Sequence, residues 1–170
     1  MAVVLEALIV DAENAPSLLA VLPDDAVAVE LEAGLVLVPL ATKWKGVLDR
    51  DGGHLGFEQL TEPLAALAEA ASATGPVAYV HLEFFGGMGF QASVIWDRGG
   101  VSLGPLFTAN HEGDLLTPAY RLISTKDAIQ DMAINAALRH LGVRADGQRD
   151  EFDTVGLGRQ RSTGDWLPRQ

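Results

Sequence analysis

The sequence predicts a single α+β domain built on a mostly antiparallel sheet, and its 170 residues suit one domain. Residues 76–107 are the longest run of strand-forming residues and contain two Gly-marked turns. Residues 26–32 alternate apolar and polar side chains, as a half-buried strand does. Apolar residues recur at helical spacing in residues 57–74 and 124–141. We expect these two main helices to pack together on one face of the sheet.

The first forty residues predict three strands and a short helix. Residues 3–10 read as a strand, and residues 16–22 as a short helix that starts at a proline. Residues 26–32 and 35–41 are expected to pair as a hairpin across a Gly-containing turn. Because Pro39 cannot donate a ladder hydrogen bond, the second strand of this hairpin is expected at an edge or to end near that residue.

A polar, Gly-rich stretch at residues 42–56 precedes the first main helix. It contains Trp44 between two lysines, and an exposed tryptophan among cations can anchor an interface. Large aromatic residues are, however, highly buried on average. Residues 57–74 then form the expected helix, with Thr61 as a capping residue and Gly75 and Pro76 as the stop signal.

Three consecutive strands are expected at residues 77–84, 90–97 and 101–107, separated by Gly-rich turns. Alternation gives each strand one apolar face and one more polar face. We expect the apolar side to pack on helices and the other side to be solvated. If the hairpin register places the polar residues opposite one another, they form a patch on the sheet. Its members are Tyr79, His81, Glu83, Gln91 and Ser93.

The second main helix, at residues 124–141, has a serine as its expected N-cap and Gly142 just beyond its end. After that glycine the helical periodicity is lost. We therefore expect an α+β domain over residues 1–142. Residues 143–170 are expected to be an extended C-terminal tail, partly docked through a few apolar anchors.

Charge is the most informative property of the composition. The chain has 12 basic and 23 acidic residues, a net charge of −11. An acidic surface repels phosphate backbones, which argues against nucleic-acid binding. It would speed encounter with a basic protein partner, although it can also serve only to keep a protein in solution.

The composition also bears on compartment. The chain has no cysteine, so disulfides and thiolate metal sites are excluded. No stretch approaches the ~18 uncharged apolar residues that predict a membrane-spanning helix. The N-terminal apolar run is interrupted by Glu6 and has no preceding positive segment, so it does not predict a signal peptide. We expect a cytoplasmic protein that binds no membrane.

Recognised catalytic motifs are missing from the sequence. His81 and Glu83 could form an acid–base pair or supply two metal ligands, but no known metal-ligand spacing surrounds them. No serine lies in a nucleophile elbow. The glycines of residues 86–89 are followed by a strand rather than by the helix that phosphate-binding loops require. We therefore expect no metal and no cofactor, and we favour a non-enzymatic role.

Residues 78–98, AYVHLEFFGGMGFQASVIWDR, resemble a pattern found in small bacterial proteins. That pattern has an extended strand, an acidic residue, an aromatic residue before paired glycines, and a second strand that ends at tryptophan. Some of those proteins resemble immunity proteins, which neutralise toxins. The resemblance implies a bacterial protein that binds another protein, and no site residue is carried over from it.

Two main hypotheses follow. The first is a protein-binding module, an immunity-type inhibitor of a basic toxin or effector, with Trp44, Glu83 and Phe85 as contact residues. The alternative is a small enzyme or ligand-binding protein whose pocket lies over the polar sheet face, using Tyr79, His81 and Glu83 together with Gln91 and Ser93. A homo-oligomer formed through that sheet face or through residues 143–170 is a third arrangement.

Overall fold

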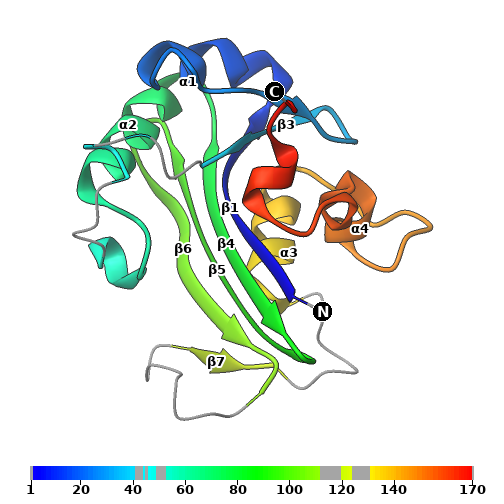
Figure 1. Cartoon of the computed structure of the whole chain (residues 1–170). Coiled ribbons are helices and arrows are strands. Elements are labelled where there is room, and N and C mark those ends of the chain that lie inside the picture. Colours follow the sequence, from blue (N-terminus) through cyan, green and yellow to red (C-terminus); the bar gives the residue numbers. More distant parts are fainter. Residues whose placement is uncertain are drawn as a thin grey trace.

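The computed structural model describes residues 2–40, 44, 46–48, 53–111, 120–123 and 131–169. Within these ranges the strands form one seven-stranded sheet in the order β2-β3-β1-β4-β5-β6-β7 (Figure 1). Neighbouring strands are antiparallel, except that β6 and β7 are parallel. The predicted α+β class and mostly antiparallel sheet are confirmed. The strands are β1 (Ala2–Asp11), β2 (Val29–Glu30), β3 (Leu35–Pro39), β4 (Val77–Phe85), β5 (Met88–Asp97), β6 (Gly100–Ala109) and β7 (Arg121–Leu122).

Helices cover both faces of this sheet (Figure 1). The helices α1 (Ala15–Val21) and α2 (Glu62–Ala71) cover one face, which we call the α2 face. The helices α3 (Ala133–His140) and α4 (Glu151–Val155) cover the other, the α3 face. Short 3-10 helices span Ala12–Asn14, His54–Gly56, Ser72–Thr74, Leu157–Arg159 and Thr163–Trp166.

The prediction that both main helices pack on one face is therefore wrong. Adjacent residues of β1 show why: Leu8 packs in the core of the α2 face and Ile9 in the core of the α3 face, and both are fully buried. Strands β1 and β4 are apolar at nearly every position rather than at alternate positions. Such strands must be covered on both sides, because each side exposes a continuous apolar surface.

Helix α2 begins at Glu62, five residues after the start of the helix predicted at residues 57–74. The Thr61 hydroxyl accepts a hydrogen bond from the backbone N–H of Leu64, at 3.3 Å, and donates one to the backbone carbonyl of Val47. This cap satisfies a helix N–H that has no partner within the helix. The buried stripe of the helix, which includes Leu64 and Ala68, then packs on the α2 face.

Of the predicted helix at 124–141, residues 124–130 lie outside the described residues, and α3 forms its later part. Ile134 and Leu138, four residues apart, are both fully buried against the α3 face. The last turn carries Arg139 and His140, whose placement near the negative end of the helix dipole is favourable.

The predicted hairpin at the glycine-rich run is confirmed. Strands β4 and β5 are joined across Gly86 and Gly87, which both have positive φ, at 57° and 87°. Two positive φ angles are what a two-residue type I′ turn needs, and glycine adopts them without strain. Glycine is needed at position 89 for a different reason, because a Cβ there would lie 2.7 Å from the Phe84 ring. These glycines therefore serve the hairpin and the packing of Phe84.

Residues 143–169, which the sequence predicts as an extended and partly docked tail, are docked through apolar side chains and include α4 and two 3-10 helices. Val155, Leu157 and Trp166 are buried in the apolar cluster of the α3 face. The backbone N–H of Val4 donates to the carbonyl of Arg161 at 2.9 Å, so this segment also pairs with the part of β1 that β3 leaves uncovered. These apolar side chains fix the segment on the sheet, although its sequence has no helical or strand periodicity that would predict this packing.

Among the described helices, none combines the length and the apolar character needed to cross a lipid bilayer.

Candidate functional site

Tyr79, His81 and Glu83 lie together on the α2 face, as alternation along one strand requires. The Tyr79 hydroxyl donates a hydrogen bond to Glu6 Oε1 at 2.9 Å, and His81 Nε2 lies 3.3 Å from Glu83 Oε1. The expectation that this face is solvated is wrong: Tyr79 is fully buried and His81 is only 3% exposed. Aromatic rings close around the group, with Phe57 against Tyr79 and Phe90 against His81.

Burial governs the protonation of this cluster. It lowers the pKa of His81 to about 4, so the imidazole is neutral at neutral pH and can donate a hydrogen bond to Glu83. Burial, and then the charge of Glu58, raises the pKa of Glu83. Burial, and then the negative charge of Glu6, raises the pKa of Tyr79 well above its ordinary value. The three side chains form a packed polar cluster, and none of them lines the cavity described below.

Gln91 and Ser93 lie on the opposite face, so the predicted five-residue patch does not exist. The register pairs His81 with Ala92 and Glu83 with Phe90, which points Gln91 and Ser93 toward α3. The register of the two-residue turn decides this, because a shift of one residue moves every side chain to the other face.

Both residues instead attach α3 to the sheet. Gln91 Oε1 accepts a hydrogen bond from the backbone N–H of Ile134 at 3.0 Å, and Ser93 Oγ donates to the carbonyl of Ala133 at 2.7 Å. Thr108 Oγ1 accepts from the N–H of Ala133 at 2.9 Å. Strand side chains therefore cap the first turn of α3, in place of a capping residue in the helix sequence.

The predicted contact residues separate into buried and exposed ones. Trp44 is 5% exposed and packs in the core of the α2 face, so it is not a surface anchor. The Glu83 side chain is partly exposed. Phe85 is 49% exposed and lies beside the hairpin turn, opposite Met88, which is 53% exposed.

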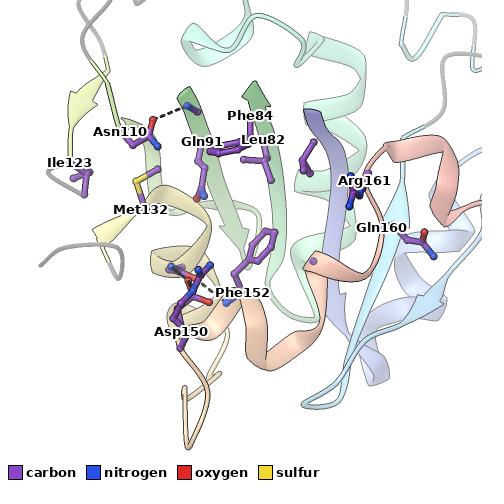
Figure 2. Close-up of a pocket in the computed structure, with 15 residues that line it drawn as sticks. Leu82, Phe84, Gln91, Asn110, Ile123, Met132, Asp150, Phe152, Gln160 and Arg161 are labelled. Atoms are coloured by element: carbon purple, nitrogen blue, oxygen red, sulfur yellow. Dashed lines mark hydrogen bonds and ion pairs between the residues drawn. The ribbon is translucent and has the colours of Figure 1, made fainter. Parts of the chain in front are cut away.

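A cavity of about 360 Å³ opens on the α3 face, between the sheet, α3, α4 and the C-terminal segment (Figure 2). Leu82 and Phe84 lie on its sheet side and Phe152 on its α4 side (Figure 2). Because β1 and β4 are paired, Val3 lies directly beside Phe84 in the same wall. The apolar walls consist of Val3, Leu82, Phe84, Ile123, Met132 and Phe152.

Several polar side chains of the cavity are held by internal hydrogen bonds. Asp150 Oδ1 accepts from the N–H of Asp153 at 2.8 Å and so caps α4, while Asp150 Oδ2 accepts from Asn135 Nδ2 at 3.3 Å. Asn110 accepts from the N–H of Gly89 at 2.7 Å and donates to the carbonyl of Gly87 at 3.1 Å. These contacts fix the shape of the cavity without a ligand.

Two arginines line the cavity. Arg149 is largely exposed, and its Nε lies 3.3 Å from Asp153 Oδ2. Arg161 is exposed, and within the described part of the chain its guanidinium makes no hydrogen bond or ion pair. Figure 2 shows Arg161 and Asp150 at opposite sides of the space that Phe84 and Phe152 border.

Sequence reasoning missed this cavity because its walls come from segments far apart along the chain. Val3 and Arg161, for example, become neighbours only because the C-terminal segment pairs with β1. The available signal was the run GLGRQR at residues 156–161, two arginines in a stretch with no acidic residue.

The described ranges contain no candidate metal site, because no three His, Asp or Glu side chains there lie close enough together to hold an ion. Comparison with protein-family models, with curated proteins and with solved structures gives no match. The resemblance of residues 78–98 to immunity-like proteins therefore stays a prediction. The geometry of the chain itself has to carry any functional proposal.

Proposed function

We propose that the chain binds a small, partly apolar molecule in the cavity on the α3 face. The observation that carries this proposal is the cavity of about 360 Å³ with apolar walls and a few polar side chains at its border. Ligand sites of proteins are concave, mostly apolar and typically of about 300–1,000 Å³. The predicted alternative had a pocket over Tyr79, His81 and Glu83, so the ligand-binding role is kept and its place is changed.

The cavity is also preorganised. Asp150, Asn135 and Asn110 are held by hydrogen bonds to their own surroundings, so their positions do not depend on a ligand. A site that is already ordered loses little conformational entropy on binding. The apolar side chains of Phe84 and Phe152 are only partly buried, and a ligand would remove their remaining surface from water.

Filling the cavity tests the proposal. Val3→Phe adds a ring to the cavity wall, whereas Val101→Phe makes the same change on an exposed position of β6. The probe is 1-octanol, with binding followed by ligand-observed NMR. We expect the unmodified protein and Val101→Phe to bind 1-octanol alike, and Val3→Phe to bind it about tenfold more weakly or not at all.

Two results would contradict the proposal: no binding of 1-octanol to the unmodified protein, or equal binding by Val3→Phe. Thermal unfolding of each variant shows whether it is folded. Val3→Leu occupies less of the space, and its intermediate effect is read if Val3→Phe does not fold.

A second candidate function, the protein-binding module predicted from the sequence, is supported by the charge of the opposite side. Residues 2–40 and 53–77, which contain α1 and α2, carry ten acidic residues and no lysine or arginine. At the end of the hairpin, Phe85 and Met88 add exposed apolar surface. An acidic surface beside exposed apolar residues suits a basic protein, such as the toxin of an immunity-type pair.

This candidate predicts charge-dependent binding to a basic partner. Partners captured from a native lysate at about 50 mM salt should be lost at about 300 mM salt, because screening weakens attraction between exposed charges. They should also be lost with the double variant Glu13→Lys and Glu69→Lys. Capture that is independent of both salt and the charge changes would count against this role.

A further inference from the structure

The electrostatics of the cavity differ from those of the protein as a whole. The net charge of the chain is −11, yet two arginines line the cavity. At physiological ionic strength, charges more than about 8 Å apart are largely screened. The acidic surface around α1 and α2 lies on the other side of the sheet, so the charges that a bound molecule meets at close range are those of Arg149, Arg161 and Asp150.

Other arginines of the C-terminal region have structural partners. Arg159 stacks on the Trp166 ring and donates to the carbonyl of Glu30 at 3.0 Å. Arg139 forms an ion pair with Glu151 at 3.3 Å. At the cavity itself, Arg149 is already paired with Asp153. These contacts engage the side chain of each of these three arginines within the fold.

Arg161 is different, because its backbone is held while its guanidinium is not engaged. Its carbonyl accepts a hydrogen bond from the N–H of Val4 at 2.9 Å, and the neighbouring Ser162 forms a parallel bridge with Val4. Arg161 lines the cavity, and within the described ranges no other side chain pairs with its guanidinium. A fixed backbone that presents a free, planar cation to an apolar cavity is suited to a carboxylate, which it can bind through two parallel hydrogen bonds.

The opposite side of the cavity limits the charge that a ligand can carry. The Asp150 carboxyl group lies there, buried and already used to cap α4 and to bind Asn135 (Figure 2). A second negative charge on the ligand would approach this carboxylate, and the one cation beside it, Arg149 at 3.9 Å from Asp150 Oδ2, is shared with Asp153. A single negative charge beside Arg161, with an apolar body over Phe84 and Phe152, avoids that repulsion.

We propose, on the basis of the proposed ligand-binding function, that the ligand is a monocarboxylate with an apolar body. Its carboxylate pairs with the Arg161 guanidinium at the border of the cavity. The apolar body lies against Phe84, Phe152 and Leu82. Arg161 is then the residue that selects the head group, while the apolar walls select the body.

The experiment compares three probes that share one alkyl chain: octanoate, 1-octanol and octyl phosphate. Affinities are measured by ligand-observed NMR titration for the unmodified protein, for Arg161→Gln and for Arg98→Gln. Arg98 is an exposed arginine at the turn between β5 and β6, so its substitution removes the same charge away from the cavity. Val3→Phe reports whether each probe binds in the cavity.

We expect octanoate to bind about tenfold more tightly than 1-octanol, because a hydrogen-bonded charge adds to the same apolar contact. Arg161→Gln should remove that advantage and leave 1-octanol unchanged, and Arg98→Gln should change neither. If the two probes bind equally, or if Arg161→Gln leaves octanoate unaffected, the head-group assignment is wrong while the proposed function stands. Tighter binding of octyl phosphate would also overturn it. Should no probe bind, or should Val3→Phe bind octanoate normally, both proposals fail.

Discussion

Both faces of the sheet carry an apolar cluster, and the two clusters are covered in different ways. The α2 face is covered by α1 and by α2, a helix of ten residues with a regular stripe of Leu and Ala. The α3 face is covered by α3, with eight residues, by α4, with five, and by turns that run to Trp166. A regular helix packs a continuous stripe against a sheet. Short helices need a polar cap at each end, and these polar groups interrupt the apolar cover.

The consequence is that the cavity lies where the cover is interrupted. Asp150 caps α4 and Gln91 caps α3, and both of these residues line the cavity. On the α2 face, by contrast, Tyr79 and His81 are enclosed by aromatic rings. Polar side chains alone therefore do not mark the candidate site. The candidate site is marked by polar side chains that border the cavity.

Matched leucine truncations test whether the elements on both faces of the sheet belong to one cooperative core. Leu64 on α2 and Leu157 in the C-terminal segment are both essentially fully buried, on opposite faces. Leu64→Ala and Leu157→Ala should each lower the free energy of unfolding by about 2–5 kcal/mol, because each removes buried methyl groups and leaves a void. Urea unfolding followed by circular dichroism measures both. A cost below about 1 kcal/mol for Leu157→Ala would mean that residues 143–169 are not part of the cooperative core.

The strands were predictable because their signals are local. Pattern and turn glycines alone were enough to place β1, β4, β5 and β6. The double-sided cover was also visible in the sequence: residues 35–40, LVLVPL, are apolar throughout, and all six are buried. A continuous apolar run of this kind predicts a strand that is buried on both faces. The prediction errs in assigning a solvated face to the strands at residues 77–84 and 90–97, which helices cover on both sides.

The candidate site was not predictable, for a physical reason. Which face Gln91 occupies depends on the hairpin register, and which residues meet at the cavity depends on the pairing of residues 161–163 with β1. Both are contacts between distant segments that no local pattern encodes. Tyr79, His81 and Glu83 were correctly grouped because they lie two residues apart on one strand, and only their burial was missed.

The buried His81 gives the α2 face a pH dependence. Its folded-state pKa of about 4 lies below the value near 6.5 in the unfolded chain, so between these values the unfolded chain binds a proton that the folded chain does not. The contribution of His81 is therefore complete above about pH 6.5 and is lost as pH falls toward 4. The expected loss is on the order of 3 kcal/mol.

Comparing unfolding curves of the unmodified protein and His81→Gln between pH 7 and pH 4 isolates this contribution, because glutamine can donate to Glu83 but does not titrate. The raised pKa of Glu83 acts in the opposite direction, since a carboxyl whose pKa is raised on folding destabilises as pH increases. We expect the variant to lose less stability than the unmodified protein over this range. If the stabilities of the two proteins fall in parallel with pH, folding does not lower the pKa of His81.

Ser93 sharpens the comparison on the α3 face, where the sheet holds its helix by hydrogen bonds. Ser93→Ala removes a buried hydrogen bond to the Ala133 carbonyl and should cost about 0.5–1.5 kcal/mol, the usual net value of one hydrogen bond. Ser102→Ala is the matched control, since Ser102 is exposed and water can replace its two contacts, with the Ile95 carbonyl at 3.5 Å and with His140 Nε2 at 3.2 Å. We expect the control to change the unfolding free energy by less than about 0.5 kcal/mol. Equal costs would mean that Ser93 does not attach α3.

The smallest expected effect concerns the helix dipoles, which differ between the two faces. Helix α3 ends with Arg139 and His140, whereas α2 has no basic residue in its last turn and carries Glu69 there. Glu69→Lys should raise the unfolding free energy by about 0.3–1 kcal/mol at low salt, because it replaces an unfavourable charge at the negative end of the helix and reduces repulsion within an acidic surface. Glu62→Lys makes the same charge change in the first turn, where a negative charge is favourable, and should therefore give no gain or a loss. Added salt should reduce the difference between the two variants, because both positions are exposed. If Glu69→Lys and Glu62→Lys change the unfolding free energy alike, the gain comes from the lower net charge alone. The position of each charge along the helix dipole then has no measurable effect.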